Sequence, residues 1–111
     1  MTTEQELQHA YRQSLGEKRV ELRRRFDALC DEDASVPQVR SLHLLLHRLA
    51  GSAGSYGYPT LSGRARQLER AWRQWLDAAP TQRSPCYQVC ASQAVAFAEL
   101  LGDMQGLAQD D

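Results

Sequence analysis

The stretch HLLLHRLAGSAG, residues 43–54, decides how this chain folds, because its apolar residues recur with the spacing of an α-helix. At about 100° per residue, the apolar side chains gather on one face suited to a protein core, namely Leu42, Leu45, Leu46, Leu49 and Ala53. His47 points roughly 140° away from the centre of this face, on the same outward side as Leu44 and Gly51. The stretch therefore predicts an amphipathic helix that presents one histidine to solvent.

Two glycines inside this helix, Gly51 and Gly54, are expected to destabilise it by about 1 kcal/mol each relative to alanine. A glycine leaves a bare patch of backbone, which allows another molecule to come close. Because the glycines follow an outward histidine, we interpret the patch as a surface at which a partner approaches His47.

The residues from His47 to Tyr58, followed by Leu61 and the pair Leu68-Glu69, resemble the histidine-containing phosphotransfer (HPt) domain. The signature of that family is His-x-x-Lys-Gly-Ser/Ala-Ala/Ser, with a glycine ten residues after the histidine and a Leu-Glu or similar pair in the next helix. The chain departs from it at Ala50, where the family frequently has a lysine. Arg48 is a candidate for the missing positive charge, although helical geometry places it on a different side from position 50.

The resemblance implies a phosphorelay intermediate of two-component signalling, without kinase activity of its own. Nε2 of His47 would exchange a phosphoryl group with the aspartyl phosphate of response-regulator receiver domains, including those of hybrid sensor kinases. Glu69 would orient the ring of His47. No cofactor is implied for this chain, because Mg²⁺ is expected on the partner receiver only. The residues expected at the docking surface are Leu44, Arg48, Gly51, Ser52 and Gly54.

The spacing of the residues also brings Glu69 toward His47. His47 precedes the turn at 55–59 by about as many residues as Glu69 follows it, so at 1.5 Å per residue both lie about 12 to 14 Å from the turn. Glu69 lies at the boundary of the apolar face of its own helix, where it can meet the preceding helix. A carboxylate that accepts from Nδ1–H would fix the ring tautomer and leave the lone pair of Nε2 outward.

Length and composition favour a single all-α domain over residues 1–111. A net charge of −1 argues against a nucleic-acid-binding module. No apolar run approaches the roughly 18 residues of a membrane span, and the polar N-terminus is unlike a signal peptide. We therefore expect a cytoplasmic monomer.

Capping and breaking signals predict an antiparallel up-down four-helix bundle with a short additional N-terminal helix. The short helix begins at Thr3 and breaks at Gly16, and the four main helices follow over about 17–30, 35–54, 60–79 and 85–107. Thr60 is the expected cap of the helix that carries Glu69. Residues 108–111 are expected to fray. The expected core includes Cys86, Cys90, Trp72 and Trp75, with Gln93 hydrogen-bonded inside or at the rim.

Two other functions fit the same residues. His43 and His47 are four residues apart, which is the spacing of a two-histidine metal site on a helix, although no further ligand is expected on that face. Alternatively, the chain could bind receiver domains as an adaptor without transferring phosphate. The intact His47 argues against an adaptor, while Ala50 leaves it open.

Overall fold

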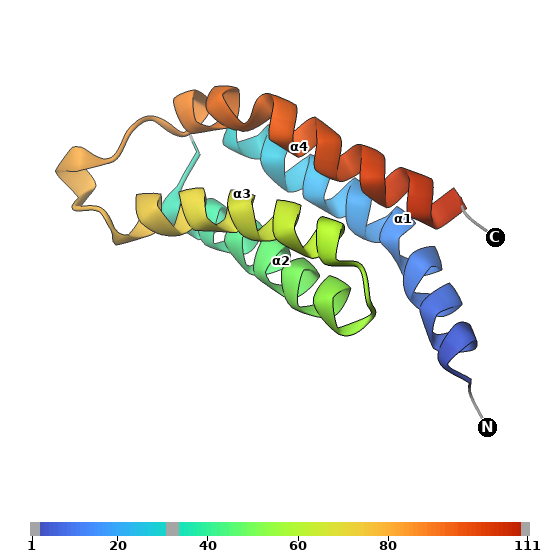
Figure 1. Cartoon of the computed structure of the whole chain (residues 1–111). Coiled ribbons are helices and arrows are strands. Elements are labelled where there is room, and N and C mark those ends of the chain that lie inside the picture. Colours follow the sequence, from blue (N-terminus) through green and yellow to red (C-terminus); the bar gives the residue numbers. More distant parts are fainter. Residues whose placement is uncertain (1–2, 31–33, 110–111) are drawn as a thin grey trace.

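The computed structural model describes residues 3–30 and 34–109, in which the regular elements are helices and no strand is present (Figure 1). The all-α fold class is therefore confirmed. The elements in chain order are α1 (Glu4–Leu29), α2 (Val36–Ser55), α3 (Pro59–Asp77), the 3₁₀-helix η1 (Pro80–Gln82) and α4 (Cys86–Gln109).

The first helix, α1, runs without a break through Gly16, so the prediction of a separate short N-terminal helix is wrong. The hydroxyl of Ser14 donates to Tyr11 O at 2.6 Å instead of capping a new helix. Buried residues continue at helical spacing on both sides of the glycine, and their burial outweighs its cost. The first turns of α1 bend away from α4 in Figure 1, which is the distortion expected near a Ser and Gly pair.

The start of α2 follows its sequence signals. Ser35 is the N-cap, and its backbone N–H donates to Gln38 Oε1 at 2.6 Å. The helix ends at Ser55, and the chain reverses through a turn in which Gly57 has φ of +87°. Residues that carry a side chain rarely adopt this backbone conformation, so glycine is required at this point of the turn.

The third helix begins one residue earlier than expected. Tyr58 is its N-cap and Pro59 its first residue, so Thr60 is not the cap. Proline suits this position because its missing N–H is one that a helix leaves unpaired. At the other end, Arg83 donates to Trp75 O at 3.0 Å and to Leu76 O at 2.8 Å. These bonds satisfy carbonyls at the end of α3.

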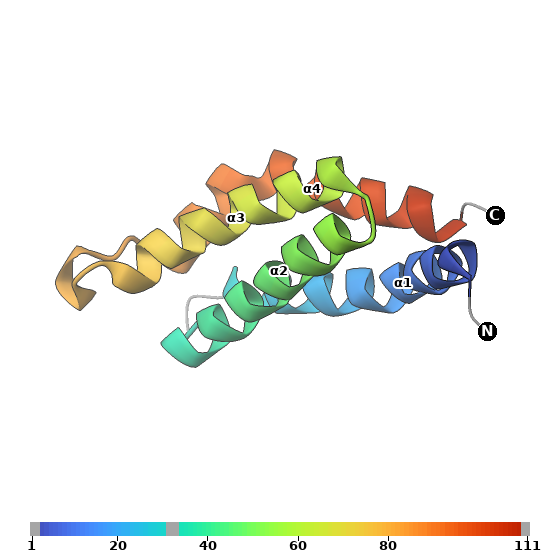
Figure 2. The ribbon, with the colours of Figure 1, turned by 60° about the horizontal axis from the view of Figure 1, so that its bottom comes forward.

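The helices form two pairs, in which α2 lies beside α3 and α1 lies beside α4 (Figures 1 and 2). The two members of each pair run in opposite directions (Figure 1). Fully buried side chains from all four helices meet between the pairs, among them Leu15, Leu46, Trp72 and Met104. The interface between the pairs is therefore the hydrophobic core.

The expected core residues lie inside, except that Leu45 and Trp75 are only partly buried. Cys86 and Cys90 are buried, and burial raises the pKa of both thiols, so they remain protonated and serve as packing residues. Gln93 is buried and its Nε2 donates to Leu68 O at 3.4 Å. Trp75 is only partly buried, because its Nε1–H reaches outward to donate to Ser84 O at 2.7 Å.

The C-terminal end of α4 is longer than expected. Residues 108 and 109 are helical rather than frayed, and residues 110–111 lie outside the described part of the chain. Among the helices of residues 3–30 and 34–109, none has the length and apolar character needed to cross a bilayer.

Candidate functional site

The outer face of α2 presents His47 to solvent. The His47 side chain is 64% exposed, and the neighbouring Leu44 is 44% exposed. One turn after the histidine, Gly51 is exposed, and a Cβ built on it would meet no atom within 4 Å. The helix is held in this orientation because its opposite face is buried in the core through Leu42, Leu46, Leu49 and Ala53.

The inner edge of the site is formed by Glu69 of α3. The turn between α2 and α3 sets the two helices in register so that Glu69 Oε1 lies 2.7 Å from His47 Nδ1. The Glu69 side chain is only 11% exposed, whereas the ring that it contacts is mostly in solvent. An ionised carboxylate only accepts hydrogen bonds, so Nδ1 is the donor in this contact. When the ring is neutral, Nε2 therefore keeps its lone pair.

A second histidine contacts the same carboxylate. His43 Nε2 lies 3.4 Å from Glu69 Oε1, and the His43 side chain is 19% exposed. Its ring stacks on that of His47 with centroids 6.3 Å apart and an interplanar angle of 17°. Sequence reasoning paired Glu69 with His47 alone, although the spacing of four residues between the histidines could have indicated a shared partner.

The metal hypothesis gains no support from this arrangement. Glu69 of α3 contacts His47, as expected, and also lies beside His43, which was not expected. Nevertheless, residues 3–30 and 34–109 contain no group of three or more His, Cys, Asp or Glu side chains placed to hold a metal ion.

Small residues let α2 and α3 approach each other beside the site. Ala50 is 2% exposed, and its carbonyl accepts from Ser62 Oγ at 2.7 Å. A Cβ built on Gly54 would lie 3.4 Å from the same Ser62 Oγ. Gly54 and Gly51 are both exposed, but Gly54 borders Ser62 of α3, whereas Gly51 has open space around its Cβ position. The burial of Ala50 explains how the chain accommodates alanine where the family frequently has lysine.

Two other expected docking residues lie toward α1. Ser52 is half-buried and its Oγ is 2.8 Å from Tyr11 Oη. Burial raises the pKa of the Tyr11 hydroxyl, which stays protonated and can donate to Ser52, while Ser52 Oγ donates to Leu49 O at 3.3 Å. Arg48 is exposed and lines a groove of about 320 Å³ between α1 and α2. Ser52 thus fastens α1 to α2, and Arg48 flanks the site on the α1 side.

Two exposed arginines share the side of α3 that carries Glu69, and sequence reasoning missed them. Arg66 and Arg73 lie three residues before and four residues after Glu69, which places them on the same side of the helix. Arg73 is 3.9 Å from Asp77, and Arg66 makes no ion pair within residues 3–30 and 34–109. The spacing of these arginines from Glu69 could have been read from the sequence. It indicates that this side of α3 is positively charged and suited to an anionic group.

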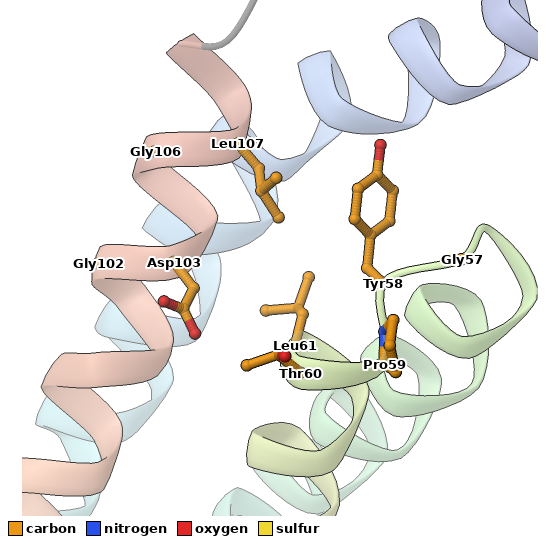
Figure 3. A pocket seen from close by; sticks show the side chains of 9 residues that line it. All are labelled: Gly57, Tyr58, Pro59, Thr60, Leu61, Gly102, Asp103, Gly106 and Leu107. Atoms are coloured by element: carbon orange, nitrogen blue, oxygen red, sulfur yellow. The ribbon is translucent and has the colours of Figure 1, made fainter.

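Another groove of the described residues lies away from the histidine site (Figure 3). It has a volume of about 500 Å³ and lies between the first turn of α3 and the last turns of α4. Asp103 at its wall is engaged by Arg64, with Nε and Oδ2 3.1 Å apart. Glu69 is about 13 Å further along α3 than Thr60 of this groove, so the groove is separate from the histidine site.

Comparison with known families identifies the class of protein. The model of the Hpt domain family matches residues 6–110, nearly the whole chain, and the chain therefore belongs to this family. No curated protein and no solved structure matches it significantly. Membership implies histidine phosphotransfer in phosphorelay signalling, in which Hpt domains interact with response-regulator receiver domains.

Proposed function

We propose that His47 is the phosphoacceptor of this Hpt domain. The observation that carries the proposal is the 2.7 Å contact between Glu69 Oε1 and His47 Nδ1, combined with the 64% exposure of the histidine side chain. The buried carboxylate fixes one ring nitrogen, and the exposed ring offers the other to a partner.

The transfer that this geometry supports is an in-line displacement. The lone pair of His47 Nε2 attacks phosphorus in the aspartyl phosphate of a receiver, the bond between phosphorus and the aspartyl oxygen breaks, and the aspartate leaves as a carboxylate. The imidazole ring becomes positively charged and keeps its Nδ1 proton, which Glu69 accepts in a hydrogen bond. The reverse reaction returns the phosphoryl group to a receiver. The Mg²⁺ for either direction belongs to the receiver.

The docking surface that we propose surrounds His47 on the outer side of α2. Leu44 supplies an apolar contact, and Gly51 leaves space for the partner's backbone. Arg48 supplies a positive charge at the α1 side. Ser52 is half-buried and Gly54 is exposed, so both stay in the proposed docking surface, and each also borders another helix, at Tyr11 and at Ser62. We further propose a cytoplasmic monomer whose receivers can be separate proteins or parts of hybrid sensor kinases.

The experiment that tests the proposal offers the purified chain to a panel of phosphorylated receiver domains. Labelled phosphate should move to the chain and be acid-labile and base-stable, as expected for a phosphoramidate. His47→Gln should abolish labelling, and His9→Gln, which alters an exposed histidine of α1, is the matched control. Labelling that survives His47→Gln, or that behaves as a phosphoester, would contradict the proposal. ATP alone should give no label.

The adaptor without phosphotransfer remains the second candidate function. It is favoured by one observation, the burial of Ala50, which leaves no side-chain cation at that position of α2. An adaptor would bind receivers in a pull-down or calorimetric titration while His47 stays unlabelled in the whole panel.

A further inference from the structure

The buried carboxylate of Glu69 contacts two imidazole rings. Its Oε1 is 2.7 Å from His47 Nδ1 and 3.4 Å from His43 Nε2. Among the residues that the structure describes, the charged contacts of Glu69 are these two histidines and include no lysine or arginine. Within the described residues, the carboxylate of Glu69 is therefore paired with histidine side chains alone.

The position of His43 differs from that of His47 in one decisive respect. The His43 side chain is 19% exposed, compared with 64% for His47, and its Nε2 is shielded from solvent. That nitrogen has no hydrogen-bond partner of good geometry within the described residues, and Glu69 Oε1 is the acceptor next to it. A buried polar group without a partner is costly, so an N–H at this position is drawn toward the carboxylate.

From this arrangement we propose that His43 is a positioning residue for phosphotransfer at His47. The N–H of His43 Nε2 holds the Glu69 carboxylate in place from the buried side, and the held carboxylate accepts from Nδ1–H of His47. His47 is thereby kept in the tautomer whose Nε2 lone pair faces the partner. The inference deepens the proposed function and rests on His47 being the phosphoacceptor.

The chemistry explains why a second donor is useful. When His47 carries a phosphoryl group its ring is cationic and binds the carboxylate strongly, but in the neutral state its attraction is weaker. The exposed His47 ring can also rotate away from the Glu69 carboxylate if that carboxylate is itself free to move. His43 supplies a constant contact from the protected side, so the carboxylate is already oriented when the phosphoryl group arrives.

Two substitutions at position 43 separate the hydrogen bond from the shape of the side chain. His43→Phe keeps a planar ring but removes the donor, and His43→Gln keeps a side-chain N–H of similar reach. In His43→Phe, ¹⁵N NMR of the His47 ring should show a smaller fraction of the Nδ1–H tautomer, and transfer from a phosphorylated receiver should slow roughly tenfold. His43→Gln should restore the wild-type tautomer and a rate within about twofold of wild type.

A double-mutant cycle with Glu69→Ala identifies the route of the effect. If His43 acts through the carboxylate, His43→Phe should cause no further slowing once Glu69 is alanine. Equal slowing in the presence and absence of Glu69 would overturn the proposal, as would wild-type tautomer and rate in His43→Phe. Circular dichroism and thermal melting should show that the variants are folded, and His43→Leu provides a second donor-free variant.

The NMR measurement needs no receiver, which keeps the two proposals distinguishable. If no receiver phosphorylates the chain, the proposed function fails, while the His47 tautomer in His43→Phe still decides whether His43 orients the ring through Glu69. If transfer occurs at His47 but substitutions at position 43 change neither the His47 tautomer nor the transfer rate, only the positioning role of His43 is overturned.

Discussion

The pair formed by α2 and α3 and the pair formed by α1 and α4 both bury apolar side chains in the core, but the first pair also carries the polar contacts of the histidine site. Between α2 and α3, these polar contacts include the bond from Ser62 Oγ to Ala50 O and the contact between Glu69 and His47. Between α1 and α4, the rings of Phe26 and Phe97 stack with centroids 3.9 Å apart.

This difference shows how one small bundle supports both stability and a reactive site. Short side chains let the backbones of α2 and α3 approach, so that a carboxylate of one helix reaches an imidazole of the other. Burying such polar groups contributes little to the free energy of unfolding. The apolar side chains that all four helices bury in the common core must therefore supply much of the stability.

The largest effect is expected from disrupting the apolar pair. Phe97 is 3% exposed, so Phe97→Ala should lower the free energy of unfolding by about 3 to 5 kcal/mol through lost burial and a cavity. Urea unfolding followed by circular dichroism measures this loss. The molecules that remain folded should transfer phosphate at close to the wild-type rate. A loss below about 1 kcal/mol would show that the α1–α4 contact is not a main source of stability.

The next largest effect is expected at the polar pair. Glu69→Ala should slow transfer by up to about a hundredfold, because a hydrogen bond to a charged group is worth roughly 1.5 to 3 kcal/mol. The ring keeps its lone pair but loses its orientation, so activity should fall without vanishing. Rapid-quench measurement of labelling gives the rate. Glu99→Ala, which removes an exposed carboxylate of α4, is the control and should leave the rate unchanged.

Two glycines of α2 allow the outer and inner faces of one helix to be compared. Gly51→Gln should slow transfer by obstructing the partner while changing stability by no more than about 0.5 kcal/mol, because its Cβ position is open. Gly54→Gln should leave the bundle less stable than Gly51→Gln does, because a Cβ at position 54 would contact Ser62 Oγ at 3.4 Å whereas position 51 is open. Receiver-dependent transfer rates and melting temperatures separate the two outcomes. Equal effects at both positions would contradict the distinction between the open glycine and the glycine that borders Ser62.

An apolar residue on the same outer face extends this comparison. Leu44 is 44% exposed, so Leu44→Asp should leave stability within about 0.5 kcal/mol of wild type. Its transfer should be slower because the receiver loses an apolar contact. Wild-type transfer in this variant, measured with the same receiver, would place the docking surface elsewhere.

The smallest effect is expected in the supporting helix. Gly16→Ala should raise the free energy of unfolding by less than about 1 kcal/mol, because position 16 is helical and a Cβ there would meet no atom within 4 Å. Thermal unfolding would detect the gain. Destabilisation would show that the bend of α1 depends on the glycine.

Much of the site was predictable because it depends on local periodicity and on one short turn. The spacing of the leucines around His47 places the histidine outward, and the turn with Gly57 sets α2 against α3 in register. The proximity of Glu69 to His47 follows from these two facts, and the structure has the contact at 2.7 Å. The role of the two residues in transfer stays a prediction.

Other features of the fold depend on contacts between helices, which the pattern of residues along one helix does not reveal. Ser14 can cap a helix or bond within one, and the buried residues on both sides of Gly16 favour the continuous α1. Gly51 and Gly54 look alike in sequence, yet only Gly54 faces a neighbouring helix.

The sequence by itself determined the helical class, the outward direction of His47 and the family, because helical period and motif are properties of neighbouring residues. Only the tertiary structure decided that α1 is continuous, that Gly54 packs against Ser62 and that His43 shares the carboxylate of Glu69. Each of these depends on which side chain of another helix lies within a few ångströms. Such distances are set by how the whole core packs, and periodicity along one helix does not specify them.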